Sequence, residues 1–481
     1  MDLKAVIRVS AGFLVFFGML VMIPAIYSLC TNDSTALSFL YIGGSTCVIG
    51  LLAFLLCRSE YEELNIRSGC AVVALSWIMA CVIGALPYYL SGTLSSFVDA
   101  FFEATSGFTG TGSSVIRSVE HTDRAVLLWR SMTQWLGGMG IIVFFIAILP
   151  LLGVGGIHLF KAEAPGPQAD KLTPRVQNVA KSLWGIYSGL TLVMIIALIS
   201  AGLSPFDAVN HAFTTMATGG FSTHSNGIAF FNSPLVDCIF IVFMFLASVN
   251  FSLHYSLLTG NPRALLENSE LKAYVLIILS CSLLITAGIY GRDYSSLLEA
   301  FRRALFEVVD TVSTTGYTHS HYLQWPVYTH VLLIMLMVMG GMSGSSAGGV
   351  KCIRFVAALK LVKLELTHVL HPTAFLTVKT DNRSLPEETL RGIWSLIFIY
   401  FINFSVATVI LTYRGLDIVS ASTAVFTALS GVGPAFGSLG PFSNFIALDD
   451  PSKLTLSACM LMGRLEFYSV LILFTPWYWQ K

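Results

Sequence analysis

Long apolar stretches recur along the whole chain and are separated by shorter, more polar segments. A helix needs about 20 consecutive apolar residues to cross the hydrocarbon core of a bilayer. Two stretches of that length begin the chain, at 11–29 and 36–57. The later stretches come in pairs, and each pair encloses a segment too short and too polar to cross by itself. The pattern predicts membrane-spanning helices with re-entrant segments between them.

The pairs define a unit that occurs four times: a long span, a short half-helix, a turn rich in Gly, Thr and Ser, and a second long span. The first spans are expected at 70–91, 183–203, 271–290 and 392–412. The second spans are expected at 124–152, 235–258, 327–349 and 453–477. Successive turns lie roughly 100 residues apart, a spacing typical of an internal repeat. We expect an all-α polytopic membrane protein whose four repeats surround one central pore.

This pattern divides the chain into five parts. The two leading helices occupy 1–68, and the first repeat occupies 69–153. A cytoplasmic loop and the second repeat fill 154–260, the third repeat fills 261–372, and a cytoplasmic segment with the fourth repeat fills 373–481.

Composition and charge agree with a membrane location. Of the 481 residues 55% are hydrophobic and only 11% are charged, too few to cover a soluble protein of this size. The formal net charge is zero, which gives no reason to expect a nucleic-acid partner. If the N-terminus is cytoplasmic, most of the 27 lysines and arginines also fall on the cytoplasmic side. This distribution favours a multi-pass protein with both termini in the cytoplasm.

The four turns each carry a glycine at the same place, at Gly112, Gly220, Gly316 and Gly433. Non-helical backbone is tolerated at membrane depth only where it is buried in protein or lines water. Inward carbonyl oxygens can replace the hydration shell of a potassium ion, in backbone conformations that glycine adopts without steric conflict. The negative C-terminal ends of the half-helices favour a cation over an anion. The turns therefore predict a cation filter.

The filter is expected to comprise Thr111, Gly112, Thr218, Gly219, Gly220, Thr314, Thr315, Gly316, Val432 and Gly433. The ion itself is expected at Thr111, Gly112, Thr218, Gly219, Thr314, Thr315, Gly431 and Val432. Hydroxyl oxygens of Thr111, Thr218, Thr314 and Ser430 are further candidate ligands just below the glycines.

A glycine-rich segment at 340–349 interrupts the second span of the third repeat. Glycine destabilises a helix by about 1 kcal/mol relative to alanine, so we expect a loop at membrane depth that acts as a gate. Close helix packing through small residues is the structural alternative. The gate residues are expected to be Gly340, Gly341, Ser343, Gly344, Ser345, Ser346, Gly348, Gly349 and Arg464.

Arg464 lies well inside the last span, where an unpaired arginine destabilises insertion by at least ~2.5 kcal/mol. It either faces the pore as a positive barrier or pairs with an acid such as Glu466. Among the half-helix acids, Glu307 and Asp310 either hold the third turn by hydrogen bonds or pair with neighbouring arginines. His319, after the third turn, is expected to be a solvated side chain.

Together with the four turns, three segments resemble the Trk/Ktr/HKT superfamily of potassium transporters: 134–142 (QWLGGMGII), 348–351 (GGVK) and 463–466 (GRLE). The resemblance covers nearly the whole chain, and its length and leading helices look most like the bacterial TrkH-type membrane subunits. It implies potassium uptake across the bacterial inner membrane, with glycine at all four filter positions favouring K+ and passing Rb+. Two departures from the family pattern are Gly110 and Gly431.

The resemblance also implies a homodimer and a cytosolic nucleotide-binding regulatory subunit of the RCK type, TrkA-like, docked on the basic segments 154–182 and 351–391. No cofactor other than the transported K+ is implied. Obligate symport of potassium with protons or sodium remains the alternative mechanism. An enzyme is not expected, because no Ser, His or paired Asp converge within the spans.

Overall fold

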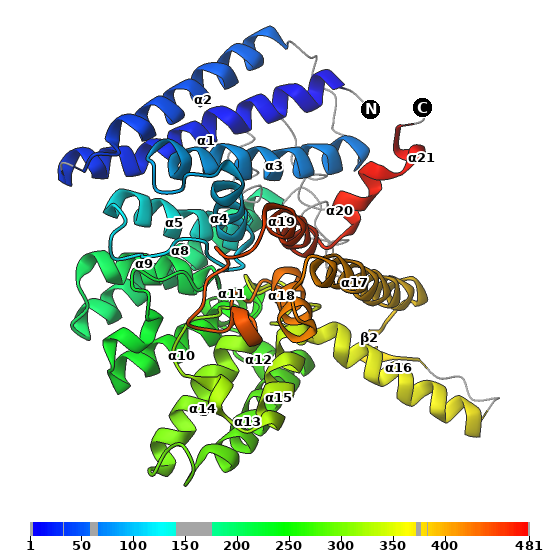
Figure 1. Cartoon of the computed structure of the whole chain (residues 1–481). Coiled ribbons are helices and arrows are strands. Elements are labelled where there is room, and N and C mark those ends of the chain that lie inside the picture. The colour runs from blue at the N-terminus through cyan, green and yellow to red at the C-terminus, as the bar shows by residue number, and fades with distance from the viewer. Residues whose placement is uncertain are drawn as a thin grey trace.

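The computed structural model describes residues 3–31, 33–57, 66–140, 176–371, 377–381 and 383–479, and these are almost entirely helical. Within them, six helices are long and apolar enough to cross a membrane. They are α1 (Leu3–Thr31), α2 (Ala36–Leu56), α3 (Ile66–Leu90), α8 (Val176–Ser200), α13 (Ser269–Ile289) and α17 (Glu387–Tyr413). Figure 1 shows α1, α2 and α3 lying side by side, with the start of α1 and the C-terminal α21 (Pro476–Trp479) at the same end of the molecule.

Four shorter helices follow the first spans of the predicted repeats: α4 (Phe97–Thr109), α9 (Pro205–Met216), α14 (Leu297–Val312) and α18 (Ile418–Ser430). Polar side chains accept hydrogen bonds from the first N–H groups of three of them, as helix N-caps do. Ser96 caps α4, Ser204 caps α9 and Asp417 caps α18. Each half-helix ends within four residues of its turn glycine.

In the second, third and fourth units, the second helix is interrupted. α5 (Arg124–Gly138) is described only to Gly140, so the rest of the predicted span 124–152 lies outside the described residues. The second unit has α10 (Pro234–Ser248) and α11 (Phe251–Leu258), and the third has α15 (Val327–Met339) and α16 (Cys352–Leu370). The fourth has α19 (Asp450–Arg464), followed by α20 (Tyr468–Leu471) and the 3-10 helix η6 (Ile472–Phe474).

The segments predicted as spans at 235–258 and 453–477 each consist of two helices with a bend between them. The chain bends by 98° between α10 and α11 and by 111° between α19 and the α20–η6 segment. Asn250 begins α11 by accepting a hydrogen bond from the Ser252 N–H, whereas Glu466 and Phe467 have positive φ values that a right-handed helix cannot accommodate. Apolar residues resume beyond both bends, although Arg464 and Glu466 interrupt them at the second.

The remaining elements are short connections, apart from α16, which extends away from the other helices in Figure 1. They are η3 (Gly227–Phe231), α12 (Arg263–Glu267), η4 (Tyr322–Gln324), η5 (Gly437–Leu439) and a hairpin of β1 (Lys379–Thr380) and β2 (Arg383–Ser384). The segment 351–391, expected to be basic and to dock a partner, begins with this long helix.

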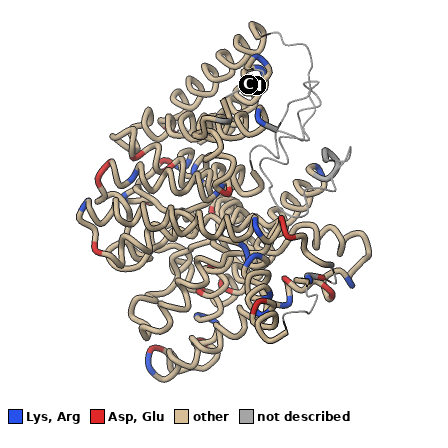
Figure 2. Tube along the Cα trace, turned by 90° about the vertical axis from the view of Figure 1, so that its right-hand side faces the viewer, with Lys and Arg blue, Asp and Glu red and all other residues tan. Residues whose placement is uncertain are grey.

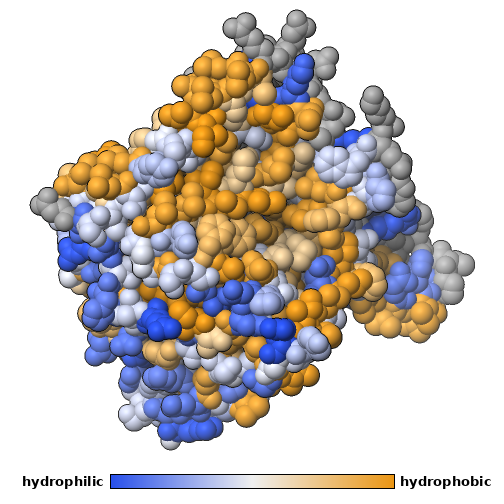
Figure 3. All heavy atoms as spheres, turned by 45° about the horizontal axis from the view of Figure 1, so that its top comes forward, coloured by the Kyte–Doolittle hydropathy of each residue, from blue (hydrophilic) through white to orange (hydrophobic). Residues whose placement is uncertain are grey.

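The outer surface has the character expected of a protein surrounded by lipid. The trace in Figure 2 carries few charged residues over most helices. Figure 3 shows a broad hydrophobic surface over the part of the molecule that contains α1 to α3. On α2, Leu37, Leu52 and Leu56 are among many large apolar side chains that are exposed. A soluble monomer rarely exposes so large an apolar surface.

Candidate functional site

Each half-helix ends in the same type of turn. One of the first two residues after each half-helix has a left-handed backbone conformation. The φ values are 72° at Gly110, 52° at Thr218, 59° at Thr314 and 72° at Gly431. The following N–H donates back to a carbonyl in the half-helix, as in the Schellman motif that closes many helices. These bonds are Thr111 to Ser106, Gly219 to Thr214, Thr315 to Asp310 and Val432 to Thr427, at 2.8–3.1 Å. Gly110 and Gly431 therefore stand where the backbone itself favours glycine.

In the second and third turns the left-handed residue is a threonine. A β-branched residue at positive φ is a true outlier, with a strain of order 1–3 kcal/mol. The Thr218 hydroxyl donates to the Ala217 carbonyl at 2.7 Å. The Thr314 hydroxyl instead accepts a hydrogen bond from the Gly348 N–H at 2.7 Å. Strained threonines thus hold the lower edge of these two turns.

The four turns contact one another in a closed ring. A Cβ added to Gly112 would lie 2.2 Å from the Gly219 carbonyl oxygen, and one added to Gly220 would lie 2.1 Å from that of Thr315. The same holds for Gly316 against Val432, at 1.5 Å, and for Gly433 against Thr111, at 2.7 Å. Each turn glycine therefore rests on the carbonyl that precedes the glycine of the next turn. No side chain larger than hydrogen fits at any of the four positions without displacement of this backbone.

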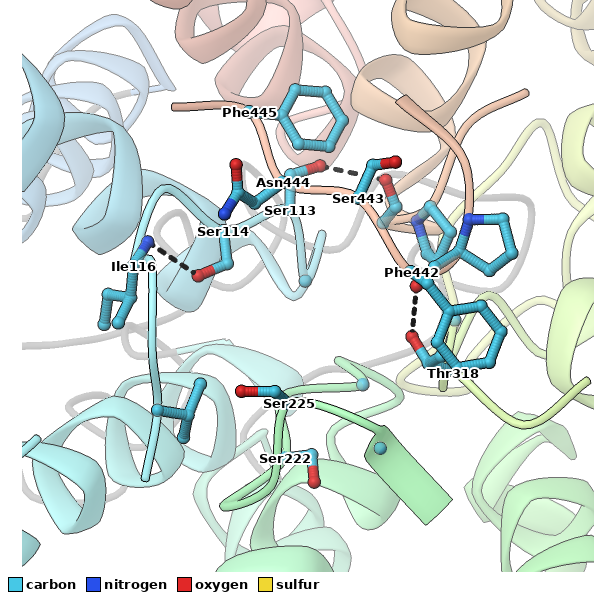
Figure 4. Close-up of a pocket in the computed structure, with 18 of the residues that line it drawn as sticks. Ser113, Ser114, Ile116, Ser222, Ser225, Thr318, Phe442, Ser443, Asn444 and Phe445 are labelled. Carbon is cyan, nitrogen blue, oxygen red and sulfur yellow. Dashed lines mark hydrogen bonds between the residues drawn. The ribbon is translucent and has the colours of Figure 1, made fainter. Parts of the chain in front are cut away.

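A cavity of about 150 Å³ opens on one side of this ring, and all four turn glycines line it. In Figure 4 the hydroxyl-bearing residues Ser114, Ser222, Ser225 and Thr318 stand around its opening. Thr318 donates to the Pro441 carbonyl and so ties the third unit to the fourth. We refer to this space as the outer cavity.

Beside the first turn, a buried ion pair within the first unit also contacts the second unit. Glu103 on α4 accepts from the Val115 N–H at 2.8 Å and from the Ser114 hydroxyl, and it pairs with Arg130 on α5 at 2.7 Å. Arg130 also donates to the Ser222 carbonyl at 2.9 Å, and its guanidinium lies 3.5 Å from the Phe221 ring centroid. The pair fixes the chain beyond the first turn to that beyond the second.

Replacing Glu103 with glutamine is expected to lower the free energy of unfolding by about 3 kcal/mol, because Arg130 then remains buried without its counter-charge. Thermal unfolding of the detergent-solubilised protein measures the change. Glu387→Gln is the matched control, since its pair with Arg391 is more than 70% exposed on both sides and is screened by solvent. Equal effects of the two substitutions would contradict the structural role of Glu103.

The second turn is held by two residues. The His211 ring nitrogen Nε2 lies 3.0 Å from the Ser222 hydroxyl, in the place that Glu103 takes beside the first turn. Gln134, from α5, donates to the Gly219 carbonyl at 2.6 Å and accepts from the Phe221 N–H at 3.1 Å. The second turn therefore depends on a helix of the first unit.

At the third turn, two buried acids act through hydrogen bonds. Asp310 accepts from the Tyr317 N–H at 2.9 Å, and Glu307 accepts from the Ser320 N–H at 2.9 Å. Of the two predicted roles for these acids, the structure thus supports the first, in which they hold the third turn by hydrogen bonds. Arg302 pairs instead with Asp237, 3.2 Å away.

The prediction that His319 is solvated was wrong. Its side chain is only 1% exposed and lies 3.1 Å from Asp237. It also stacks on Phe306, with ring centroids 3.9 Å apart. The residues that contact it come from α10, 82 residues earlier in the chain, and from the nearby half-helix α14.

The fourth turn lacks a buried acid. Ala424 stands where the other half-helices carry Glu103, His211 and Glu307, and the adjacent Thr423 hydroxyl accepts from the Phe436 N–H at 3.0 Å. Below the turn, the Ser430 hydroxyl lies 2.8 Å from that of Tyr400. The four turns thus share a backbone geometry but differ in what holds them.

Residues 340–351 form a loop under the ring, between α15 and α16. Its two ends touch at glycines, since a Cβ on Gly340 would lie 2.2 Å from the Gly348 oxygen and one on Gly349 would lie 2.6 Å from the Gly340 Cα. Gly341 packs on Ala347 too closely for a side chain, and Gly344 packs tightly on Asn250 with a φ of 75° that favours glycine. These contacts explain the run of glycines.

Hydrogen bonds attach this loop to the surrounding helices. The Ser346 hydroxyl reaches the Met216 and Ala247 carbonyls at 2.9 and 3.0 Å, whereas the Ser345 hydroxyl bonds within the loop to Met342 at 2.6 Å. Glu270 at the start of α13 accepts from the N–H groups of Ser343 and Ile353, at 2.9 and 3.0 Å. One carboxylate thus holds both the loop and the start of α16.

Arg464, at the end of α19, bridges the loop to the first unit. Its guanidinium donates to the Ser346 carbonyl at 3.0 Å and to the Gly138 carbonyl, at the end of α5, at 2.7 Å. The alternative partner suggested by the sequence, Glu466, pairs with Arg354 on α16 at 2.5 Å. Arg464 therefore acts on backbone carbonyls.

A second cavity, of about 20 Å³, separates the ring from the loop. Gly110, Thr218 and Gly431 line it above, and Ser346, Gly348 and Arg464 line it below. A space of this size admits a single water-sized particle. We call it the inner cavity.

The structure brings the ten expected filter positions together in the ring and places the nine expected gate residues beneath it. The sequence did not identify Gln134 and Glu270 as parts of these sites. Gln134 stands in a motif that the sequence marked, but its target is in another repeat. Glu270 appears in the sequence only as an acid at a helix start.

The comparisons with known proteins agree with these features. The model of the TrkH family, described as "Cation transport protein", matches residues 40–287 and 293–481. The chain is 36% identical to the Trk system potassium uptake protein TrkH of Escherichia coli and 37% identical to that of Halomonas elongata, over the full length of both. The crystal structure of the potassium transporter TrkH from Vibrio parahaemolyticus superposes with a TM-score of 0.90 at 34% identity, covering all of both chains. The chain belongs to the TrkH family of cation transport proteins.

Proposed function

We propose that this protein carries potassium into the cell through a pore at the centre of four repeats, each a long helix, a half-helix, a turn and a second helix. The observation that carries the proposal is the closed ring of turn glycines and carbonyl oxygens. Such a ring offers a cation several oxygen ligands in place of water. The half-helices add the negative ends of their dipoles on the same side of each turn. The relatives, which are potassium uptake and potassium transporter proteins, support potassium as the ion.

The filter in this proposal consists of the ring positions named above, with the carbonyls of Thr111, Gly219, Thr315 and Val432 as the central ligands. The Thr111 hydroxyl is 2.8 Å from that of Thr109, and the Thr315 hydroxyl is 2.7 Å from that of Ser313. These bonds make the hydroxyls supports of the turns, and leave the carbonyls as the principal ligands. The outer cavity is then the entrance to the filter.

We assign the loop 340–351 and Arg464 to the gate. They lie immediately below the inner cavity, where a cation leaving the filter meets both a backbone barrier and a positive charge. The loop is glycine-rich and non-helical, and it is held by the hydrogen bonds described above, so it can move without breaking a helix. Glu270 connects the loop to α13 and to the start of α16, and Arg354 on α16 donates to the Val350 carbonyl of the loop, which gives a cytoplasmic partner a mechanical route to the gate.

The proposal includes a homodimer in the bacterial inner membrane, with both termini cytoplasmic, and a cytosolic RCK-type regulatory subunit. Support comes from α16, which starts directly after the gate loop, extends from the other helices and carries Lys360 and Lys363. A partner bound to α16 acts on the gate through the same bonds. The segment 154–182, also expected to dock a partner, lies largely outside the described residues.

Ion flux through the purified protein in liposomes tests this function. We expect K+ and Rb+ to pass at similar rates and Na+ and Li+ to pass at least about tenfold more slowly, since the ring ligands fit the larger ions. Equal passage of all four ions would refute the filter. A reversal potential that follows the potassium gradient alone indicates channel-like conduction, whereas a shift with the proton or sodium gradient indicates symport.

A further inference from the structure

Gln134 has an unusual position, because its side chain bonds directly to an oxygen of the ring. It lies on α5 in the first unit, is fully buried, and reaches the second turn. Its amide donates to the Gly219 carbonyl at 2.6 Å and accepts from the Phe221 N–H at 3.1 Å. The Phe221 N–H can only donate, so the amide oxygen faces Phe221 and the NH₂ group faces Gly219.

The other three carbonyls of the ring differ in this respect. Across the described residues, no side chain donates a hydrogen bond to the carbonyl of Thr111, Thr315 or Val432. One ligand of four is therefore fixed and polarised by an amide, and the ring is chemically asymmetric although its backbone geometry is repeated.

The packing around Gln134 leaves little freedom for this contact. A Cβ on Gly219 would lie 2.4 Å from the Gln134 side-chain carbon Cδ. Close below, Gly137 and Gly138 bring α5 against the first and second turns, since a Cβ on Gly137 would lie 1.9 Å from the Phe108 oxygen and one on Gly138 would lie 2.7 Å from the Ala217 Cα. The helix holds Gln134 in place, and Gln134 holds the carbonyl.

We propose that Gln134 is a positioning residue that sets the preference of the filter for K+ over Na+, an inference that rests on the function proposed above. Two physical effects act in the same direction. A fixed carbonyl cannot move inward to coordinate the smaller ion, and a carbonyl that already accepts an N–H bond presents a weaker field, which disfavours the ion with the higher charge density. Loss of the amide therefore favours Na+.

The test compares Gln134→Leu and Gln134→Met with the unchanged protein in liposomes, using K+ and Na+ flux measured on the same preparation. Both substitutions remove the donor and the acceptor and keep most of the side-chain volume. We expect the K+/Na+ flux ratio to fall about 2- to 10-fold, the range that one hydrogen bond produces. Met is included because its flexible side chain fits where Leu disturbs the packing.

Ser131→Ala is the matched control. Ser131 is buried on the same helix, and its hydroxyl bonds at 3.2 Å to the Leu127 carbonyl of α5 itself, away from the ring. A purely structural effect of mutating α5 lowers the flux of both ions together and leaves their ratio unchanged. If both Gln134 variants conduct with the unchanged ratio, the inference is wrong, whatever their absolute flux.

The outcome also separates this inference from the proposed function. An unchanged protein that does not discriminate between K+ and Na+ refutes the filter itself. A selective unchanged protein whose Gln134 variants remain equally selective refutes only the role of Gln134.

Discussion

Replacing Gly316 with alanine is expected to reduce potassium uptake about 100-fold or more. The new Cβ would lie 1.5 Å from the Val432 carbonyl oxygen, a backbone atom that cannot rotate away. The residue would also have to keep a φ of 75°, which alanine adopts only with strain. Both effects displace the fourth turn from the ring, and distortion of this kind destabilises a packed site by several kcal/mol. Growth of an uptake-deficient bacterial strain on low potassium, together with rubidium uptake in vesicles, measures the effect.

Gly189→Ala is the control for this prediction. Gly189 lies within α8, has no atom within 4 Å of an added Cβ, and gains helix propensity from the change. It should express and transport as the unchanged protein does. Normal uptake by Gly316→Ala would mean that the third and fourth turns do not form the ring described here.

Arg464→Ala is expected to raise potassium flux on the order of tenfold in the absence of any partner protein. The substitution removes a positive charge below the filter and the hydrogen bonds that hold Ser346 to the end of α5. Bonds to a charged donor contribute about 1.5–3 kcal/mol each, so their loss shifts the gate toward the open arrangement. Tracer flux into liposomes at fixed protein content measures the change.

Arg414→Ala separates the gate from a general loss of arginine. Arg414 pairs with Asp449 at a partly exposed site between α17 and α19, away from both cavities. Its loss should leave flux unchanged. Unaltered flux in Arg464→Ala, with the protein still folded by its thermal unfolding profile, would exclude Arg464 from the gate.

The hydrophobic pattern predicted the helices and turns well, because lipid imposes strict requirements on composition and length. The four glycines were found because the four turn sequences carry a glycine at the same place. The left-handed residues two positions earlier were not recognised as a common feature, because two are glycines and two are threonines. Only the repeated Schellman bonds show that Gly110, Thr218, Thr314 and Gly431 are equivalent.

The bends in the second helices were not predicted, because an apolar stretch resumes after Asn250 and after Phe467. A bend there depends on partners from elsewhere in the chain, such as the Gly344 carbonyl that accepts from the Phe251 N–H at 3.0 Å. The same limit applies to Gln134, Glu270 and His319. Their roles depend on contacts between segments far apart in the sequence, which a local pattern does not encode.

The unequal supports of the four turns have a consequence for how such a filter changes over evolutionary time. In a pore built from four identical chains, one mutation alters every quadrant at once. Here Glu103, His211, Glu307 and Ala424 occupy equivalent places and are separately encoded. One quarter of the ring can therefore be adjusted while the other three continue to hold the ion. Selectivity in a single-chain pore is open to gradual tuning by single substitutions.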